Sequence, residues 1–252
     1  MTHKTLISGT AYEVVGGAQM IDGTKFQMGG GKTILGGTGY DIPFSKGVPL
    51  STVTPGAILY LNESGSPVPF YIAKHDYESG LNGAGRTLVV RKELSRYYNF
   101  SESSNEYANS ELDSWLCDTW LKLLGADIQT AIGTTRFYYT PGYRSSSITT
   151  LQRAAFQLSA TELGGSTSSM NKEGSTLSIA STLRIAYRNG EALGQWTRTP
   201  TTNSSTSVCY FDNFGRFYVG SYNHMYGYRP AFTLPGMLRL AQNADGTYTL
   251  AA

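Results

Sequence analysis

The chain has 252 residues, of which 15% are charged, and its formal net charge at pH 7 is +2. A balance so close to neutral gives no electrostatic reason to expect a nucleic-acid partner. No stretch approaches the ~20 apolar residues that span a bilayer, and the N-terminus lacks an apolar signal core. We therefore expect a protein made in a cytoplasm, without a membrane partner. The 29 glycines and 18 tyrosines suit turns and short strands, which favours a β-rich fold.

A repeat with a period of 14 occupies the first fifty residues and consists of "TLISGTAYEV", "QMIDGTKFQM" and "TILGGTGYDI". The units align at a threonine, at an aromatic residue and at Gly9, Gly23 and Gly37. Each unit predicts two short strands joined by a turn at the Gly-Thr step. Units this small cannot bury a core alone, so we expect residues 1–50 to pack on copies of themselves or on a larger particle.

From about residue 56 the chain changes to longer apolar segments. A hairpin around Ser64-Gly65-Ser66 is predicted by "AILYLNESGSPVPFYIAKHDY", and a strand buried on at least one face by "RTLVVRKEL". Near the C-terminus, a last hairpin that turns at Asp245-Gly246 is predicted by "LRLAQNADGTYTL".

One long helix is predicted at about 110–124 by "NSELDSWLCDTWLKLLG". Ser110 and Asp113 form an acceptable capping box at its start, and Gly125 suits its end. Its apolar stripe consists of Leu112, Trp115, Leu116, Trp120, Leu123 and Leu124.

Several motifs occur in an order that resembles an uncharacterised domain family of bacteriophage virion proteins and prophage-rich gut bacteria. They are "YIAKHDYE", "RTLVVRKEL", "NSELDSWLC", "FQLSATELGG", "LRIAYRNGE", "QWTRTP" and "GYRPAFTLP". The likeness covers roughly residues 55–238, and the repeats look like modules that precede such domains in phage proteins. That family resembles the C-type-lectin-like fold, which phage receptor-binding proteins and formylglycine-generating enzymes share.

The resemblance implies an α+β fold in which a C-type-lectin-like domain has a mostly antiparallel sheet and one main helix. This domain is expected at 51–240, after a β-hairpin repeat region at 1–50 and before a C-terminal hairpin or tail at 241–252. In such a fold the chain ends meet inside a core sheet.

A structural role follows for "GYRPAFTLP". We expect Arg229 to pair with a buried carboxylate or with carbonyls, and Phe232 and Leu234 to point into the core. "QWTRTP" is expected to supply the matching scaffold on a neighbouring strand. Four residues are thus predicted to be buried and close in space: Trp196, Arg198, Arg229 and Pro230.

Between these two motifs lies a segment dense in Tyr, Asn, Ser, Asp and Arg. Tyrosine supplies a large contact area with few rotamers, and Ser and Asn supply adaptable hydrogen bonds, as in antibody paratopes. The alternative is a solvated loop around a β-hairpin. Phe211, Phe214 and Phe217 are expected to support the segment from beneath. The predicted exposed binding residues are Tyr210, Asp212, Asn213, Arg216, Tyr218, Tyr222, Asn223, His224 and Tyr226.

Catalytic chemistry finds little support. None of the three histidines has a neighbouring nucleophile with acid–base spacing, and metal-ligand spacings are absent. The formylglycine generators need a reactive cysteine pair, whereas Cys117 and Cys209 both look like small buried hydrophobic residues. We therefore expect no enzyme, and no catalytic residue, metal or cofactor.

The sequence predicts a bacteriophage virion structural protein, a head or tail fibre or a decoration protein, that displays a binding domain for host-surface attachment. The expected partners are other virion proteins through residues 1–50, a host-surface glycan or protein, and further copies of the chain in a homotrimer. Two alternatives stay open. One is a bacterial adhesin or sugar-binding module of the same fold, and the other is an enzyme related to the formylglycine generators.

Overall fold

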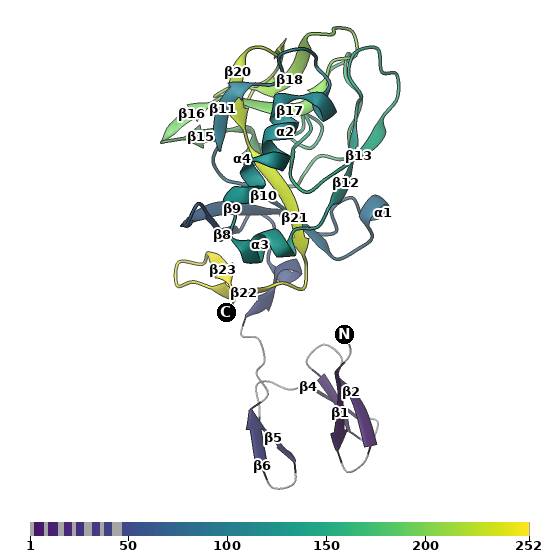
Figure 1. The fold of residues 1–252 in the computed structure, drawn as a ribbon, viewed down its shortest axis with the longest axis vertical. Coiled ribbons are helices and arrows are strands. Elements are labelled where there is room, and N and C mark those ends of the chain that lie inside the picture. The colour runs from purple at the N-terminus through teal and green to yellow at the C-terminus, as the bar shows by residue number, and fades with distance from the viewer. Residues whose placement is uncertain are drawn as a thin grey trace. The chain divides into compact units, whose positions relative to one another are not determined.

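The computed structural model describes residues 47–251 and, within residues 1–46, the strands alone. The chain divides into two compact units, the first formed by Met1–Lys46 and the second by Gly47–Ala251 (Figure 1). The boundary therefore lies a few residues before the expected one at residue 50.

The first unit contains one antiparallel strand pair in each repeat. The pairs are β1 (His3–Ile7) with β2 (Thr10–Val14), β3 (Ala18–Ile21) with β4 (Thr24–Gln27), and β5 (Lys32–Leu35) with β6 (Thr38–Asp41). This confirms the predicted hairpins. Each repeat's threonine belongs to the second strand. The aligned glycines lie outside the described residues.

The larger sheet of the second unit has eight strands in the order β14-β21-β10-β9-β8-β23-β22-β7. Every pairing in it is antiparallel except that of β8 with β23. Its strands are β7 (Val48–Pro49), β8 (Ile58–Glu63), β9 (Ser66–Lys74), β10 (Arg86–Arg91), β14 (Phe156–Gln157), β21 (Pro230–Pro235), β22 (Arg239–Gln242) and β23 (Tyr248–Leu250).

This strand order places the two ends of the second unit side by side, as expected. The C-terminal hairpin lies between β8 and β7, so the region predicted as separate at 241–252 is an integral part of the sheet. Both predicted tight turns are present. Ser64 and Gly65 have φ of 54° and 81° between β8 and β9, and Gly246 has φ of 83° between β22 and β23.

The smaller sheet has five strands in the order β11-β20-β17-β18-β19, with β17 and β20 parallel. Its strands are β11 (Arg96–Asn99), β17 (Gln195–Pro200), β18 (Ser207–Phe211), β19 (Phe217–Ser221) and β20 (Met225–Tyr228). Two further hairpins consist of β12 (Thr135–Tyr139) with β13 (Thr149–Arg153), and β15 (Ala186–Arg188) with β16 (Glu191–Leu193). Strands make up 39% and helices 16% of the structure, so the predicted α+β class with mostly antiparallel pairing holds, in two sheets instead of one.

The helices are short. They are α1 (Ser79–Asn82), α2 (Glu111–Asp118), α3 (Ala126–Ala131) and α4 (Ala180–Arg184), with 3-10 turns η1 (Leu50–Thr52), η2 (Tyr107–Asn109) and η3 (Trp120–Leu123). The predicted start of α2 is confirmed, because Ser110 Oγ accepts a hydrogen bond from Asp113 N–H at 3.1 Å.

The predicted length of that helix, to about residue 124, is wrong. The end of η3 and the residues that follow form backbone hydrogen bonds with the end of β8 and the turn after it: Ser64 N–H donates to Leu123 O at 2.6 Å, and Gly125 N–H donates to Asn62 O at 2.9 Å. These tertiary bonds replace the next helical turn. Leu123 is consequently 36% exposed, although the helical stripe predicted it to be buried.

The core contacts of β21 agree with the prediction for "GYRPAFTLP". Phe232 and Leu234 are fully buried. The Phe232 ring packs edge-on against Phe70 of β9, with centroids 5.6 Å apart, and lies 5.8 Å from Trp120 of η3. The face of the larger sheet that carries Phe232 and Phe70 thus packs against the segment that follows α2.

Candidate binding face

Three tyrosines from three strands of the smaller sheet form a continuous stack, called here the tyrosine face. Tyr210 of β18 stacks on Tyr226 of β20, with centroids 4.1 Å apart and an interplanar angle of 16°. On its other side Tyr210 stacks on Tyr218 of β19, its partner in the strand register, at 5.8 Å. Trp196 of β17 packs edge-on against Tyr226 at 4.8 Å and holds the stack from the buried side.

A missing side chain makes room for this stack. Gly194 precedes β17, and a Cβ there would lie 2.6 Å from Cδ1 of Tyr226. Gly194, Tyr97, Tyr210, Asp212, Asn213 and Tyr226 help to line a hollow of about 230 Å³. Sequence reasoning missed Tyr97 and Gly194; the position of Gly194 directly before "QWTRTP" was the available signal.

The turn between β18 and β19 is organised by Asp212. Its carboxylate accepts hydrogen bonds from the main-chain N–H of Phe214 at 2.9 Å and of Arg216 at 2.8 Å, and pairs with the Arg216 guanidinium at 2.7 Å. Desolvation opposes ionisation, but these hydrogen bonds outweigh it and lower the pKa of Asp212. The carboxylate is therefore occupied by its own turn, and Arg216 is held where its guanidinium lies 5.7 Å from the Tyr218 ring centroid.

The support expected from beneath is only partly present. Phe211 is buried and its ring centroid lies 5.6 Å from that of Phe217, which is half-buried. Phe214, by contrast, is 66% exposed and contacts the Arg216 guanidinium at 4.8 Å. Its predicted supporting role is wrong, because the hydrogen bonds to Asp212 turn this residue outward at the tip of the hairpin.

None of the nine predicted binding residues is buried. Tyr210, Asp212, Tyr222 and Tyr226 are half-buried, and the exposed ones are Asn213, Arg216, Tyr218, Asn223 and His224. His224 lies 6.3 Å from the Tyr226 ring. Tyr222 packs against the core, and its carbonyl accepts from Phe100 N–H at 2.8 Å. The structure therefore brings most of these residues to one region, with Tyr222 in a supporting position.

The four predicted scaffold residues are all buried, and Gln157 of β14 joins them. Gln157 Nε2 donates to Trp196 O at 2.6 Å, and the main-chain carbonyl of Gln157 accepts from Arg198 Nη1 at 3.0 Å. Its Oε1 accepts from Arg229 N–H at 2.9 Å, and Gln157 is the register partner of Pro230. The expectation that "QWTRTP" lies on a strand next to "GYRPAFTLP" holds for the start of that motif, because Gly227 of β20 pairs with Gln195 of β17. It is wrong for the rest of the motif, since β21 belongs to the other sheet.

Residues 84–236 match the family described as "Domain of unknown function (DUF6273)", and this match spans more than half of the chain. The chain belongs to the DUF6273 family. No match was found among curated proteins or among solved structures. The DUF6273 region extends from just before β10 to the end of β21, so it contains the whole tyrosine face and both buried motifs.

Inside the DUF6273 region, Arg198 lies between two buried glutamates. Its Nη1 is 2.8 Å from Glu162 Oε2, and its Nε is 3.6 Å from Glu173 Oε2. Burial disfavours the charged guanidinium, but attraction to Glu162, with smaller contributions from Tyr77 and Glu173, raises the pKa of Arg198 above its usual value. Burial also raises the pKa of Glu173. All three side chains are closed to solvent, so the cluster holds the loops of the domain together instead of meeting a ligand.

His75, Cys117 and Cys209 all lie in structural environments. His75 Nε2 lies 2.8 Å from Val53 O, which can only accept, so Nε2–H is the donor there, and Nδ1 lies 3.0 Å from the Thr87 hydroxyl. Burial raises the pKa of the Cys117 thiol to about 11, and it also raises the pKa of Cys209.

Within residues 47–251, no group of three His, Cys, Asp or Glu side chains could hold a metal ion. No helix in the described part of the chain is long and apolar enough to cross a membrane.

Proposed function

We propose that this DUF6273 protein is a recognition protein of a bacteriophage virion. In this proposal the second unit is a C-type-lectin-like domain that attaches to a host-surface glycan or protein, and the first unit connects it to other proteins of a head or tail fibre. The observation that supports recognition most strongly is the tyrosine face, a stack of Tyr210, Tyr218 and Tyr226 beside a hollow of about 230 Å³. The virion setting is supported by the order of the sequence motifs and by the hairpin repeats.

The chemistry of the tyrosine face favours binding over catalysis. Asp212 is committed to its turn, and burial together with hydrogen bonding to Tyr210 raises the pKa of Tyr226, so its phenol stays neutral. What remains available is aromatic surface with amide, imidazole and guanidinium groups at its edge. Such groups stack on sugar rings or contact proteins without a reacting centre.

Two other functions receive less support. A bacterial adhesin with the same fold would use the same face, and the neighbouring genes distinguish it, since capsid and tail genes accompany a virion protein. An enzyme related to the formylglycine generators would need a reactive thiolate, whereas a pKa of about 11 keeps Cys117 protonated at neutral pH.

The binding test uses Tyr218→Ala, because Tyr218 is 42% exposed and its removal leaves the Tyr210–Tyr226 stack in place. Tyr143→Ala is the matched control, since Tyr143 is 41% exposed and lies outside the tyrosine face. Purified wild-type protein is measured against host cells and a panel of host-surface glycans. We expect Tyr218→Ala to weaken binding by about tenfold or more while Tyr143→Ala leaves it unchanged. If binding is unchanged in both variants, the face is misplaced; if the wild type binds neither cells nor glycans, the recognition proposal fails.

A further inference from the structure

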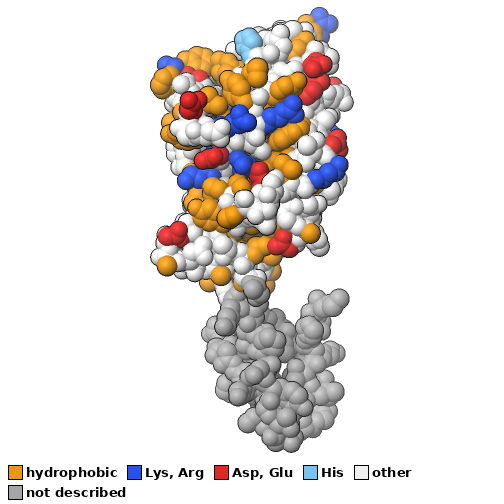
Figure 2. Space-filling model, turned by 60° about the vertical axis from the view of Figure 1, so that its left-hand side comes forward, with side chains coloured by type: hydrophobic (Ala, Val, Ile, Leu, Met, Phe, Trp, Pro, Cys, Tyr) orange, Lys and Arg blue, Asp and Glu red, His pale blue; other side chains and the backbone are white. Residues whose placement is uncertain are grey.

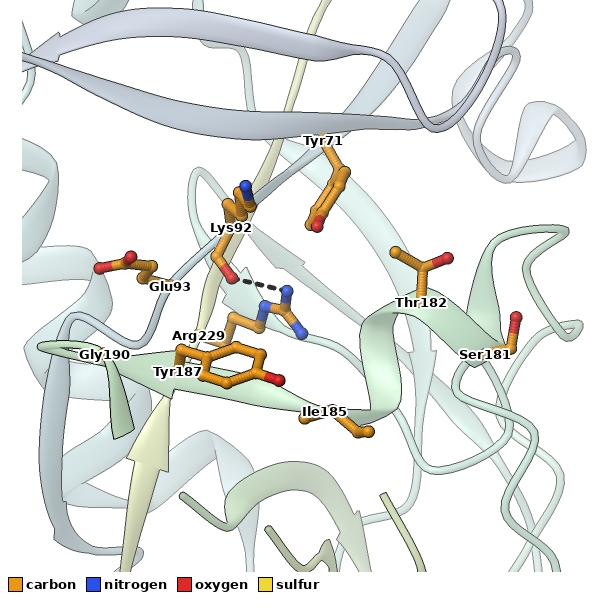
Figure 3. Close-up of a pocket in the computed structure, with 9 residues that line it drawn as sticks. All are labelled: Tyr71, Lys92, Glu93, Ser181, Thr182, Ile185, Tyr187, Gly190 and Arg229. Carbon is orange, nitrogen blue, oxygen red and sulfur yellow. Dashed lines mark hydrogen bonds between the residues drawn. The ribbon is translucent and has the colours of Figure 1, made fainter. Parts of the chain in front are cut away.

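A second hollow, of about 490 Å³, lies between the chain after β10, helix α4 and the β15–β16 hairpin (Figure 3). Tyr71 of β9, Thr182 of α4, Ile185 and Tyr187 line it together with Arg229. It shares no lining residue with the hollow of the tyrosine face. Its volume is within the range of pockets that hold small ligands.

The guanidinium of Arg229 lies at the centre of this pocket, among Tyr71, Thr182 and Tyr187 (Figure 3). The side chain is only 2% exposed. Its Nε, Nη1 and Nη2 donate to three main-chain carbonyls, those of Arg91 at 2.8 Å, Leu183 at 2.6 Å and Lys92 at 2.7 Å. Arginine has five N–H donors, so one N–H on each terminal nitrogen has no acceptor in the part of the chain that the structure describes.

The charge of Arg229 is not compensated. Within residues 47–251, no carboxylate lies within 4.0 Å of its guanidinium, whereas the equally buried Arg198 has two glutamates. Burial, together with repulsion from Arg91, lowers the pKa of Arg229 to about 10. The side chain is still charged at neutral pH, and a buried charge without an opposite charge is costly.

The rim of the pocket does not supply the missing charge. Lys92 and Glu93 both line it, and both are exposed, so their opposite charges are screened by solvent and largely offset each other. The remaining walls offer the hydroxyls of Thr182 and Tyr187 and the apolar surface of Ile185. A ligand that suits this lining has an anionic end and a small, partly polar body.

We propose that this pocket binds the carboxylate of a small acidic ligand, the size of one sugar or one amino-acid residue, with the Arg229 guanidinium as its ion-pair partner. The planar guanidinium matches a carboxylate in shape as well as in charge. On the face of the second unit that Figure 2 shows, Lys and Arg side chains are interspersed with Asp, Glu and hydrophobic side chains and form no broad basic patch. This site is independent of the tyrosine face, and binding at either can fail without the other.

The test titrates the full-length protein with pairs of probes that differ only in the carboxylate. Glucuronic acid is compared with glucose, and N-acetylglycine with its N-methylamide. Binding is followed by calorimetry at constant ionic strength. We expect at least one acid to bind about tenfold or more tightly than its neutral partner, and the pair that responds identifies a sugar acid or an amino-acid carboxylate. If neither acid binds at up to about 10 mM, or if each neutral probe binds equally well, the proposal is wrong.

Position 182 locates the site without disturbing Arg229. Thr182 is exposed on α4, so both Thr182→Glu and Thr182→Gln should fold. The glutamate places a second carboxylate in the pocket and repels the ligand, while the glutamine has the same shape without the charge. We expect Thr182→Glu to bind the acid about tenfold more weakly than Thr182→Gln. Equal affinity in the two variants would show that the acid binds elsewhere and would overturn the proposal.

Discussion

Arg198 of β17 and Arg229, which lies between β20 and β21, both bond to Gln157. Arg198 donates from its guanidinium to the main-chain oxygen of Gln157 at 3.0 Å, and Arg229 donates its main-chain N–H to the side-chain oxygen of Gln157 at 2.9 Å. The base of the tyrosine face and the strand at the centre of "GYRPAFTLP" are therefore joined through one buried amide.

Replacement of the Gln157 side-chain amide should destabilise the fold. Gln157→Leu leaves Arg229 N–H and Trp196 O buried without partners, so we expect the free energy of unfolding to fall by about 3 kcal/mol. Gln152→Leu is the control, because Gln152 is exposed and its side chain bonds only to Thr134. Urea denaturation followed by tryptophan fluorescence measures both. Equal stability of the two variants would contradict the joining role of Gln157.

The burial of Glu173 predicts that the stability of the fold depends on pH. Burial raises the pKa of Glu173 above its ordinary 4.5, so above that pH the folded protein keeps a proton that the unfolded chain has lost. The contribution of Glu173 to stability therefore falls as pH rises from 4.5 through the raised pKa. Glu173→Gln should remove this slope. Denaturation at several pH values should then show that the wild type loses stability relative to the variant as the pH rises. Parallel stability curves for the two proteins would be inconsistent with this assignment.

The two thiols should be unreactive in the folded protein. Both cysteines are free, and burial raises the pKa of Cys117 to about 11 from an ordinary 9.0. Between these values the folded state holds the proton more tightly than the unfolded state, so this contribution to stability is lost as pH rises from 9 toward 11. A colorimetric disulfide reagent at pH 8 should label neither cysteine quickly, and should label both in denaturant. Rapid labelling of native protein, absent in Cys117→Ala, would show a reactive Cys117.

Close packing at Gly227 should make this position intolerant of a side chain. A Cβ at Gly227 would lie 2.3 Å from Leu94 Cδ1 and 2.7 Å from its Cγ, and Leu94 is buried. Gly227→Ala should therefore lower the free energy of unfolding by about 2 kcal/mol. Gly80→Ala is the matched control: it meets no atom within 4 Å in α1, and it should be neutral or slightly stabilising. Thermal unfolding of both variants separates the two cases, and similar melting temperatures would disprove the clash.

The repeats predict assembly. Short hairpins expose strand edges that partners usually cover, so we expect a homotrimer joined partly through residues 1–50. Light scattering on the full chain should give three times the 27.4 kDa mass of one chain, and a variant that lacks residues 1–46 should associate more weakly. A full-length protein that stays monomeric over a wide concentration range would rule this arrangement out.

Features with local causes could be predicted from the sequence. The Ser64-Gly65 and Gly246 turns need positive φ, and Ser110 caps α2 through a bond three residues away, so short patterns were sufficient. The buried state of Arg229 was also predicted, from the resemblance that places "GYRPAFTLP" in a core sheet at the base of the polar segment.

Features with distant causes could not be predicted. The α-helix ends at Asp118, and the segment that was predicted to continue it bonds instead to a distant part of the chain, with Gly125 bonding to Asn62, 63 positions earlier in the sequence. The strands β17 and β21 lie in different sheets and are connected through Gln157, which no local pattern marks as a connection. The pocket around Arg229 is formed by Tyr71, Thr182 and Tyr187, which only the folded chain brings together. The hydrogen bonds of Asp212 lie within its own turn, but the composition of the segment did not show that they occupy the carboxylate.

The edge strand β7 also has a mechanical consequence. Tension that enters the second unit from Lys46 first reaches Val48 and Pro49, whose only strand partner among the described residues is β22. Two residues can be peeled from an edge under little force. The next residue, Leu50, is fully buried and its N–H donates to Leu238 O at 2.8 Å, so peeling should stop there. A protein held by its first unit would thus yield by a short, reversible extension under load, while the tyrosine face and the Arg229 pocket keep their shape.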